Sequence, residues 1–310
     1  MIYIAGLLAR VTLFLSKENM NIKERIIEGI LFLCAAVCVL TTVGIIIILL
    51  IQSVQFFSEV SIVDFLTDTQ WTPLFAEKHF GILPLITGTL LTTIIAILIA
   101  LPLGLSIAIY LSEYATKELR ATLKPMLEIL AAVPTVVYGY FALTVVTPLL
   151  QHIIPGLSGF NALSPGLVMG IMIVPFVSSL SEDAMYAVPN AMREASLALG
   201  ASKYQTAIKV IVPAASSGIL VSIILAFSRA IGETMIVAIA AGQQPRLTLD
   251  PRVPIETITT YIVQVSSGDV PHGSLEYRTI FAAGLTLFVI TFILNNISYF
   301  IRKKYHEQYE

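Results

Sequence analysis

REASLALGASKYQTAIKVIVP, residues 193–213, is the stretch from which the rest of this sequence is best understood. It is polar enough to lie in water, yet apolar runs long enough to cross a membrane flank it on both sides. Its first half contains good helix formers, and Gly200 is expected to interrupt that helix. A second, basic turn leads to Pro213, where we expect a long apolar helix to begin. Such a short helix between two spans is a poor active site but a good attachment point for a protein outside the membrane.

The spacing of residues in this stretch resembles the EAA loop of ATP-binding-cassette (ABC) importer permeases. Glu194 and Ala195 match the start of that motif, and Ser196 replaces its second alanine. Gly200 follows, and Pro213 comes thirteen residues after it. An ordinary linker helix would leave this spacing without a reason. In the family the loop is a coupling helix that docks on the ATPase subunit, which implies that role for Arg193, Glu194, Ala195, Gly200 and Pro213.

The composition indicates an integral membrane protein. The 310 residues are 56% apolar and 12% charged, with a mean hydropathy of +0.87, whereas soluble domains average roughly 45–50% apolar and about 25% charged. The net charge of −2 and the lack of a basic block give no electrostatic basis for binding nucleic acid. The sequence has no GxxxxGKS/T phosphate-binding loop. The chain therefore does not itself carry a P-loop for ATP. Because no nucleophile–base or metal constellation lies at the end of a span either, we expect no cofactor in this chain and no enzymatic activity of its own.

Cysteine and histidine give no sign of a metal site. Cys34 and Cys38 lie one helical turn apart in an apolar run, where small fillers of a span are favoured over a thiol pair or metal ligands. The four histidines fall singly in different polar segments, so no ligand cluster is expected.

Six membrane spans are predicted, which makes the chain an all-α integral membrane protein. The predicted spans cover about 26–51, 83–111, 126–150, 165–188, 214–242 and 279–301. We divide the chain into a cytoplasmic N-terminal segment (1–25), a six-span permease domain (26–302) with the EAA-like loop at 189–213, and a cytoplasmic tail (303–310). The polar segment 52–82 holds the only tryptophan, Trp71, which suits a membrane interface.

The first 19 residues allow two interpretations. The stretch is apolar but too short to cross about 30 Å of hydrocarbon, and Arg10 interrupts it. It is either a helix lying in the membrane interface or an upstream extension, with Met20 as the working start. It is not a cleavable signal, because the apolar run that follows is far longer than that of a signal.

The distribution of Lys and Arg predicts the orientation in the membrane. With both termini inside, 13 of these residues lie in the cytoplasm and 4 lie outside, while Arg229 falls within a span. The positive-inside rule therefore favours cytoplasmic termini and a cytoplasmic EAA-like loop. This is the side of the cell membrane on which an ATPase must be.

Small residues recur where helices are expected to touch. Gly166 and Gly170 form a GxxxG pair in the fourth span, and Gly218, Ser222 and Ala226 follow one face of the fifth. Such faces let helix backbones approach closely in lipid.

Arg229 and Glu233 are the charges expected deepest in the membrane. They are four residues apart, so a continuous fifth helix would place them on one face. Arg229 lies 16 residues after Pro213, about 24 Å along such a helix. Charges at this depth are costly and usually serve a polar path or a partner. Either the two neutralise each other as a packing feature, or the guanidinium binds an anion that passes through.

The same residues resemble a second, narrower motif. Residues 229–234, RAIGET, are similar to the R-A-x-G-E-T sequence of permeases of phosphate-specific transport (Pst) importers, in which the Arg and Glu are needed for transport. Residues 132–139, AVPTVVYG, resemble another stretch of that family, and residues 273–295 resemble the last span of its C-type subunit. The resemblance covers about residues 20–302. It implies the type I ABC importer (MetI-like) permease fold and a substrate path through Arg229 and Glu233.

The Pst resemblance also implies partners. These are a homologous A-type permease, two copies of an ATPase that holds ATP and Mg, and an extracytoplasmic phosphate-binding protein. Two alternatives stay open: a permease of the same class for another oxyanion or small solute, and a secondary transporter driven by an ion gradient. The second alternative predicts inverted halves with broken helices and no docking loop.

Overall fold

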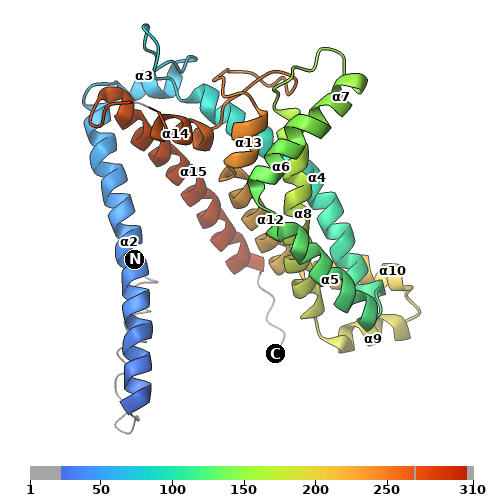
Figure 1. Cartoon of the computed structure of the whole chain (residues 1–310). Helices are drawn as coiled ribbons and strands as arrows, with labels where there is room; N and C mark the ends of the chain where they lie inside the picture. Colours follow the sequence, from blue (N-terminus) through green and yellow to red (C-terminus); the bar gives the residue numbers. More distant parts are fainter. Residues whose placement is uncertain (1–21, 269, 306–310) are drawn as a thin grey trace. The chain divides into compact units, whose positions relative to one another are not determined.

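The computed structural model describes residues 22–268 and 270–305 (Figure 1). These residues are mostly helical and contain no β-strand beyond two isolated bridges, Trp71–Phe80 and Gly242–Ile255. The expected all-α class is therefore confirmed. The first 19 residues, with their two interpretations, and the end of the predicted tail (306–310) lie outside the described residues.

The helices follow one another along the chain with short connections. They are α2 (Ile22–Phe57), α3 (Ile62–Thr67), α4 (Leu83–Ile109), α5 (Lys117–Ala132), α6 (Thr135–Phe141), α7 (Thr147–Ile153), α8 (Leu163–Tyr186), α9 (Asn190–Ala198), α10 (Lys203–Thr206), α11 (Val212–Ala214), α12 (Ser216–Ile231), α13 (Met235–Ala240), α14 (Ile258–Ser266) and α15 (Leu275–Tyr305). Three π-helical turns join some of them: η1 (Tyr110–Tyr114), η2 (Ala142–Val146) and η3 (Ala207–Ile211).

Five helical segments are long and apolar enough to cross a membrane, and a bent pair would make a sixth span. The five are Lys23–Phe57, Leu83–Tyr114, Thr135–Ile153, Leu163–Tyr186 and Leu275–Ile297. The bent pair joins Lys203–Ala214 to Ser216–Ile231 at 73°. Counted as one span, that pair brings the number to the six predicted.

The chain divides after Ile51 into two compact units. The first contains most of α2, which has no charged residue between Gly29 and Ile51 and is apolar on every side there, as expected of a span that faces lipid. Its Cys34 and Cys38 are free thiols. The second unit, from Gln52 onward, contains all the remaining helices and all sites described below.

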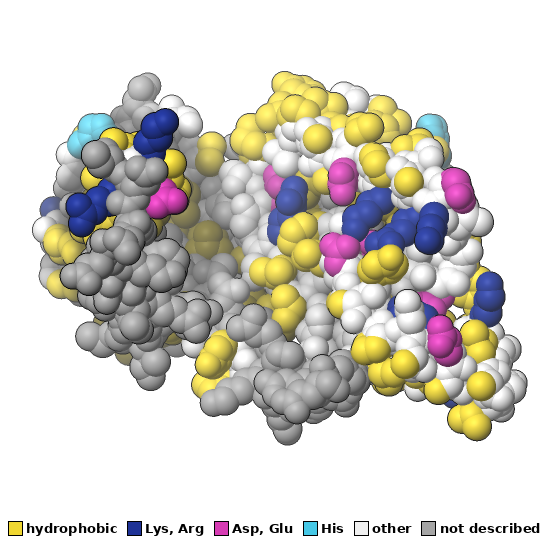
Figure 2. Space-filling model, turned by 90° about the horizontal axis from the view of Figure 1, so that it is seen from below, with side chains coloured by type: hydrophobic (Ala, Val, Ile, Leu, Met, Phe, Trp, Pro, Cys, Tyr) yellow, Lys and Arg dark blue, Asp and Glu magenta, His cyan; other side chains and the backbone are white. Residues whose placement is uncertain are grey.

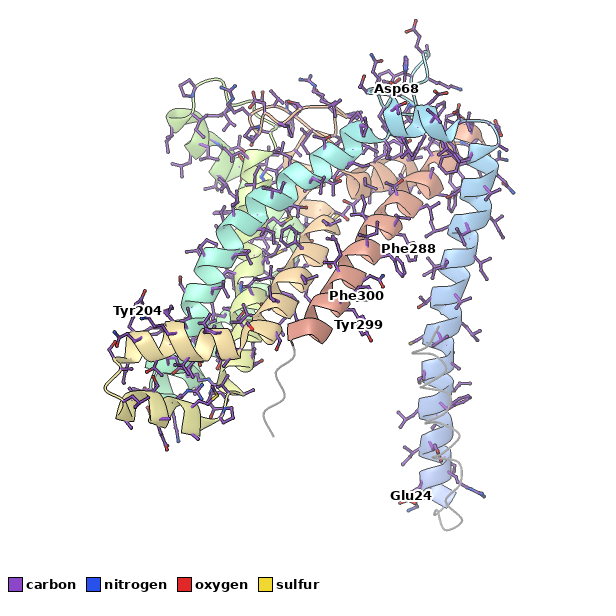
Figure 3. The ribbon with its side chains drawn as sticks, turned by 180° about the vertical axis from the view of Figure 1, so that it is seen from behind. Glu24, Asp68, Tyr204, Phe288, Tyr299 and Phe300 are labelled. Atoms are coloured by element: carbon purple, nitrogen blue, oxygen red, sulfur yellow. The ribbon has the colours of Figure 1, made fainter. Side chains whose placement is uncertain are left out.

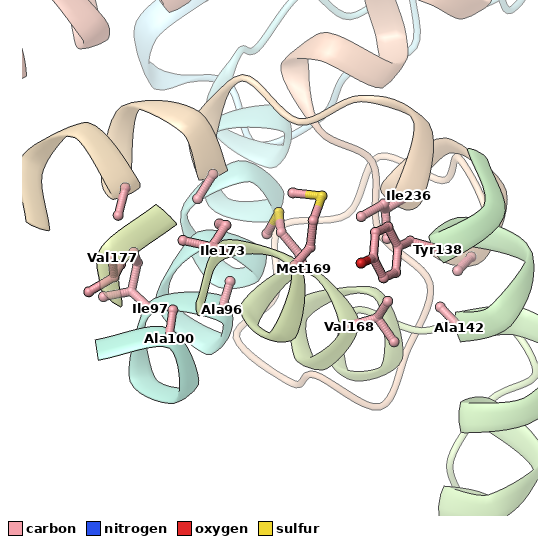
Figure 4. Close-up of a cluster of buried hydrophobic side chains, with 14 residues drawn as sticks. Ala96, Ile97, Ala100, Tyr138, Ala142, Val168, Met169, Ile173, Val177 and Ile236 are labelled. Carbon is pink, nitrogen blue, oxygen red and sulfur yellow. The ribbon is translucent and has the colours of Figure 1, made fainter. Parts of the chain in front are cut away.

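The core of the second unit forms where α8 packs against α4 and α12. Its buried side chains include Ala96, Ile97 and Ala100 of α4 and Met169, Ile173 and Val177 of α8 (Figure 4). Glycines allow the close approach. A Cβ at Gly170 would lie 2.8 Å from the carbonyl oxygen of Ala96, and one at Gly218 would lie 2.4 Å from the Cβ of Ala184. The predicted small-residue faces of the fourth and fifth spans are thus confirmed.

The third span begins later than predicted. Its expected range was 126–150, but α5 ends at Ala132 and the apolar segment runs over Thr135–Ile153. Pro134 has no N–H to continue the hydrogen-bond ladder, and it holds Val133 in an extended conformation (φ −64°, ψ 131°). α5 is instead a separate amphipathic helix without a buried residue.

The fifth span is not the single helix that was predicted for 214–242. Pro213 lies inside α11, and the chain bends by 73° at Ala215 before α12 begins. α12 ends at Ile231, and α13 starts only at Met235. The span therefore has two breaks, one on each side of α12.

Trp71, which the sequence analysis expected at a membrane interface, is enclosed by other side chains of the protein. Its ring is 1% exposed and packs edge-to-face against Tyr261, with 5.0 Å between ring centroids. The polar segment before α4 folds back through the Trp71–Phe80 bridge, and it encloses the indole in a second core with Phe56 and Phe65.

The two ends of the second unit differ. α5, α9 and α10 lie at one end, which we call the α9 end, whereas α3, α7 and α14 lie at the opposite end, the α14 end (Figure 1). Figure 2 looks at the α9 end and shows Lys and Arg side chains gathered there among a few acidic ones.

Candidate functional site

Gly200 separates two helices in the EAA-like loop, as predicted. Its backbone has φ +84°, a left-handed conformation that glycine adopts at little cost. The N–H of Gly200 donates to the carbonyl oxygen of Leu197 (2.9 Å), and the N–H of Ala201 donates to that of Ser196 (3.2 Å). These two bonds form a Schellman motif, which closes the carboxyl end of α9.

The next helix starts with an equally well-defined cap. The Ser202 hydroxyl accepts the N–H of Gln205 (3.3 Å), and the Gln205 side chain accepts the N–H of Ser202 (2.9 Å). This capping box fixes the start of α10. The turn at Gly200 is therefore held on both sides.

Replacing Gly200 with valine is expected to destabilise this turn by about 1–2 kcal/mol, because a β-branched residue tolerates the left-handed conformation poorly. A Cβ here would meet nothing within 4 Å, so lack of space is not the cause. Gly200→Asn should lose much less stability, since asparagine adopts this backbone conformation readily. Thermal unfolding of the purified variants measures the difference. Equal losses for valine and asparagine would contradict this account.

Arg193 points into the chain and ties α9 to its neighbours. Its guanidinium pairs with the Glu113 carboxylate (Nη2–Oε1 3.0 Å) and donates to the carbonyl oxygens of Met185 (2.7 Å) and Val188 (2.6 Å). The side chains of Arg193 and Glu113 are 16% and 10% exposed. Arg193 thus orients α9 against the end of α8 and against η1.

The outer side of α9 and α10 is exposed and partly apolar. We call it the α9–α10 surface; it consists of Glu194, Ala195, Leu197, Leu199, Lys203 and Tyr204. Leu199 is 90% exposed and Tyr204 is 66% exposed, and Tyr204 stands out from α10 in Figure 3. Pro213 lies apart from this surface, in α11, just before the bend.

A charged cluster that the sequence did not reveal lies beside the loop. The carboxylate of Glu182 in α8 is fully buried, and both Arg120 and Lys124 of α5 pair with it. Lys124 also pairs with Asp183 (2.6 Å), and the Arg120 guanidinium lies 4.0 Å from the centre of the Tyr186 ring. The cluster holds α5 against the end of α8. Only the alternation of charges along α5 hints at it in the sequence.

Arg229 lies near the end of α12 and is exposed on the second unit. Since α12 begins at Ser216, Arg229 is about 20 Å along its axis. Its guanidinium is 5.7 Å from the centre of the Phe176 ring, a cation–π distance. Within residues 22–268 and 270–305, no acidic side chain forms a salt bridge with Arg229. Its N–H donors are therefore available.

Glu233 does not share a helix with Arg229, which corrects the expected i, i+4 arrangement. α12 ends at Ile231, and the Glu233 carboxylate accepts the N–H groups of Met235 (3.0 Å) and Ile236 (3.3 Å) at the start of α13. Mutual neutralisation of the two charges, one of the two interpretations, is therefore not what the structure shows. Gly232, between them, was the sequence signal for the break.

Glu256 is a buried carboxyl at the α14 end that the sequence did not single out. Glu256 is 1% exposed, and its Oε1 has no hydrogen-bond partner among the described residues. Burial raises the pKa of Glu256 from its ordinary value of 4.5 to about 8. The carboxyl is therefore mainly protonated at neutral pH.

This shift predicts a pH-dependent stability. The folded chain holds the Glu256 proton more tightly than the unfolded chain, so its stability should fall as the pH rises from 4.5 to about 8. The shift corresponds to about 5 kcal/mol in total. Glu256→Gln, which cannot ionise, should lose that part of the slope. Thermal unfolding of both proteins across this range measures it, and parallel curves would contradict the assignment.

Comparison with known proteins places these features in a family. Residues 100–307 match the family described as binding-protein-dependent transport system inner membrane component. The chain belongs to this family. The match begins within α4 and runs through α15, and so it contains the α9–α10 surface, Arg193 and Arg229.

Several relatives of this permease family resemble most of the chain. The probable ABC transporter permease protein YqgH of Bacillus subtilis is 35% identical over 293 residues, which cover 90% of this chain and 94% of that protein. The phosphate transport system permease protein PstC of Mesorhizobium japonicum is 36% identical over 249 residues (74% and 75%). A probable PstC of Methanocaldococcus jannaschii is 33% identical over 250 residues (75% and 78%).

Solved structures confirm the expected type I importer permease fold. A bacterial ABC transporter involved in the import of alginate matches with a TM-score of 0.59 at 17% identity, covering 89% of this chain and 96% of the other. The MetNI methionine ABC transporter matches with a TM-score of 0.55 at 16% identity, covering 73% and 95%. At these identities the likeness concerns the fold alone.

Proposed function

We propose that this chain is a transmembrane permease subunit of an ATP-driven phosphate importer. The observation that carries the proposal is the identity of 33–36% with proteins named as phosphate transport permeases, over about three quarters of the chain. The geometry of Arg229 supports it. A guanidinium whose donors are available can bind a phosphate through two parallel hydrogen bonds.

The α9–α10 surface is the proposed docking site for the ATPase subunit. Leu199 and Tyr204 would enter a groove of the partner, while Arg193 would act from inside by holding α9 in position. Closure of the two ATPases on ATP would then move α9 and, through the bend at Ala215, tilt α12 with Arg229. ATP and Mg would be bound by the ATPase, so bond breaking would not take place on this chain.

We infer the orientation and the partners from the same features. The α9 end carries the basic residues of two loops, which supports placing it in the cytoplasm with both termini. Arg229 is exposed on the second unit, and a homologous A-type permease would supply the other half of the path. An extracytoplasmic phosphate-binding protein would deliver the substrate at the α14 end, and the complex would lie in the cell membrane of a bacterium or archaeon.

Reconstitution tests the proposal. The chain, the second permease, the ATPase and the binding protein in liposomes should accumulate labelled phosphate only with ATP, and excess sulfate or molybdate should not compete. ATP-driven uptake of another oxyanion instead would indicate the alternative substrate. Uptake driven by an ion gradient without ATP would overturn the class. Transport with the ATPase but without a second permease would show that a homodimer suffices.

A further inference from the structure

A cavity of about 400 Å³ lies at the α14 end, apart from Arg229 and from the α9–α10 surface. Its walls come from the segment before α4, from the loop after α13 and from α14. The lining side chains that matter chemically are Trp71, Gln243, Gln244, Glu256, Tyr261 and Gln264. Its volume is within the range of small-ligand sites.

The Glu256 carboxyl in this cavity lacks part of the hydrogen bonding that a buried polar group needs. It is almost fully buried, and one oxygen lacks a partner among the described residues. No Lys, Arg or His belongs to the lining. The nearby Arg246 is outside the lining and donates to the amide oxygen of Gln244 (2.9 Å). A buried carboxylate is stable only when a cation or several hydrogen-bond donors compensate for its lost hydration.

The rest of the lining suits a cation with an organic body. The rings of Trp71 and Tyr261 pack edge-to-face and form one wall, and aromatic rings attract cations. The Gln264 amide adds a carbonyl acceptor. The lining offers no fixed positive charge, which an anion such as phosphate would need.

We propose that this cavity binds a guanidinium or ammonium group, with Glu256 as its counter-ion. Two sources can supply such a group: a free organic amine, or a Lys or Arg side chain of a protein docked on the α14 end. The proposal concerns a different site from the phosphate path and does not rest on the proposed function.

The single tryptophan makes the test direct, because Trp71 lines the cavity. The full chain, in tryptophan-free polymer nanodiscs at constant ionic strength, is titrated with methylguanidinium or butylammonium chloride while tryptophan emission is recorded. We expect a saturable change with both cations and none with uncharged methylurea. Glu256→Gln should weaken the apparent affinity at least about tenfold, as expected for a lost charge-assisted contact. Glu77→Gln, which removes an exposed carboxylate outside the lining, should change nothing.

The pH dependence separates this site from unspecific binding. Because burial raises the pKa of Glu256 to about 8, a cation must displace the proton, and the affinity should rise about tenfold per pH unit up to that value. The other charged or titratable groups on the described segments around the cavity include Tyr261, Glu276, Lys78 and Arg246, together with His79 and Glu77, which are hydrogen-bonded to Thr72 of the lining. Burial raises the pKa of Tyr261, and the Lys78 hydrogen bond lowers that of Glu276, so neither titrates between pH 6 and 8.

A second arm, which does rest on the proposed function, distinguishes the two sources. Displacement of the extracytoplasmic binding protein by methylguanidinium would assign the natural group to that protein's side chain. Unchanged docking would assign it to a free amine. The cation site itself is overturned if wild type and Glu256→Gln bind equally, if no cation saturates, or if the affinity does not change with pH.

Discussion

Replacing Arg229 with leucine is expected to lower ATP-driven phosphate uptake by about a hundredfold while the amount of the chain in the membrane stays the same. A charge-assisted contact with a desolvated anion contributes a few kcal/mol, and each 1.4 kcal/mol is a factor of ten. Removal should not harm folding, because no salt bridge of Arg229 occurs within the described residues. Uptake and membrane abundance are measured together.

Two further variants show whether Arg229 acts as an anion ligand. Arg229→Lys should stay well below wild type, because a point charge cannot reproduce the planar pair of donors. Arg252→Leu is a matched control, since that arginine is also exposed but pairs with Asp250 in the loop before α14. Its loss should leave uptake nearly unchanged.

Glu233 allows the packing interpretation to be tested. If the two charges neutralised each other, Arg229→Leu combined with Glu233→Leu would restore uptake. The structure predicts no rescue, because Glu233 instead caps α13 through the N–H groups of Met235 and Ile236. The losses of uptake caused by the two substitutions should add on a free-energy scale, as they do for independent sites. Near-normal uptake in the double variant would overturn the anion path.

Local chemistry decided which parts of the fold could be predicted. Gly200 interrupts its helix because a left-handed turn favours glycine wherever it occurs in a fold. Gly170 predicted a close helix contact because a small residue leaves room for a neighbouring backbone. Both features follow from the residue itself, without knowledge of its partner.

The missed features depend on partners far away in the sequence or on a break in a helix. Glu182 and Lys124 are 58 residues apart, so only the packing of α5 on α8 brings them together. The relation of Arg229 to Glu233 assumed a continuous helix, and the break at Gly232 removed it. A spacing of four residues therefore shows that two polar side chains share a helix face only if the helix is continuous between them.

Replacing Arg193 with alanine is expected to reduce co-purification of the ATPase by about a hundredfold and to lower the stability of the chain as well. The change leaves the Glu113 carboxylate and two carbonyl oxygens without their donor. Breaking such a pair costs about 3–5 kcal/mol when it is buried. α9 then loses its fixed orientation, although the α9–α10 surface itself is unaltered. Affinity pull-down and thermal unfolding measure the two effects.

A double change distinguishes this positioning role from direct contact with the ATPase. Arg193→Leu with Glu113→Leu leaves no unpaired charge, although the carbonyl oxygens of Met185 and Val188 still lack their donor, so it should recover part of the stability and part of the docking. Glu194→Gln, on the exposed side of α9, should weaken docking while the unfolding temperature stays unchanged. If Arg193→Ala behaved like Glu194→Gln, with weak docking and normal stability, Arg193 would touch the ATPase itself. In that case its guanidinium would have to leave Glu113 when the complex forms.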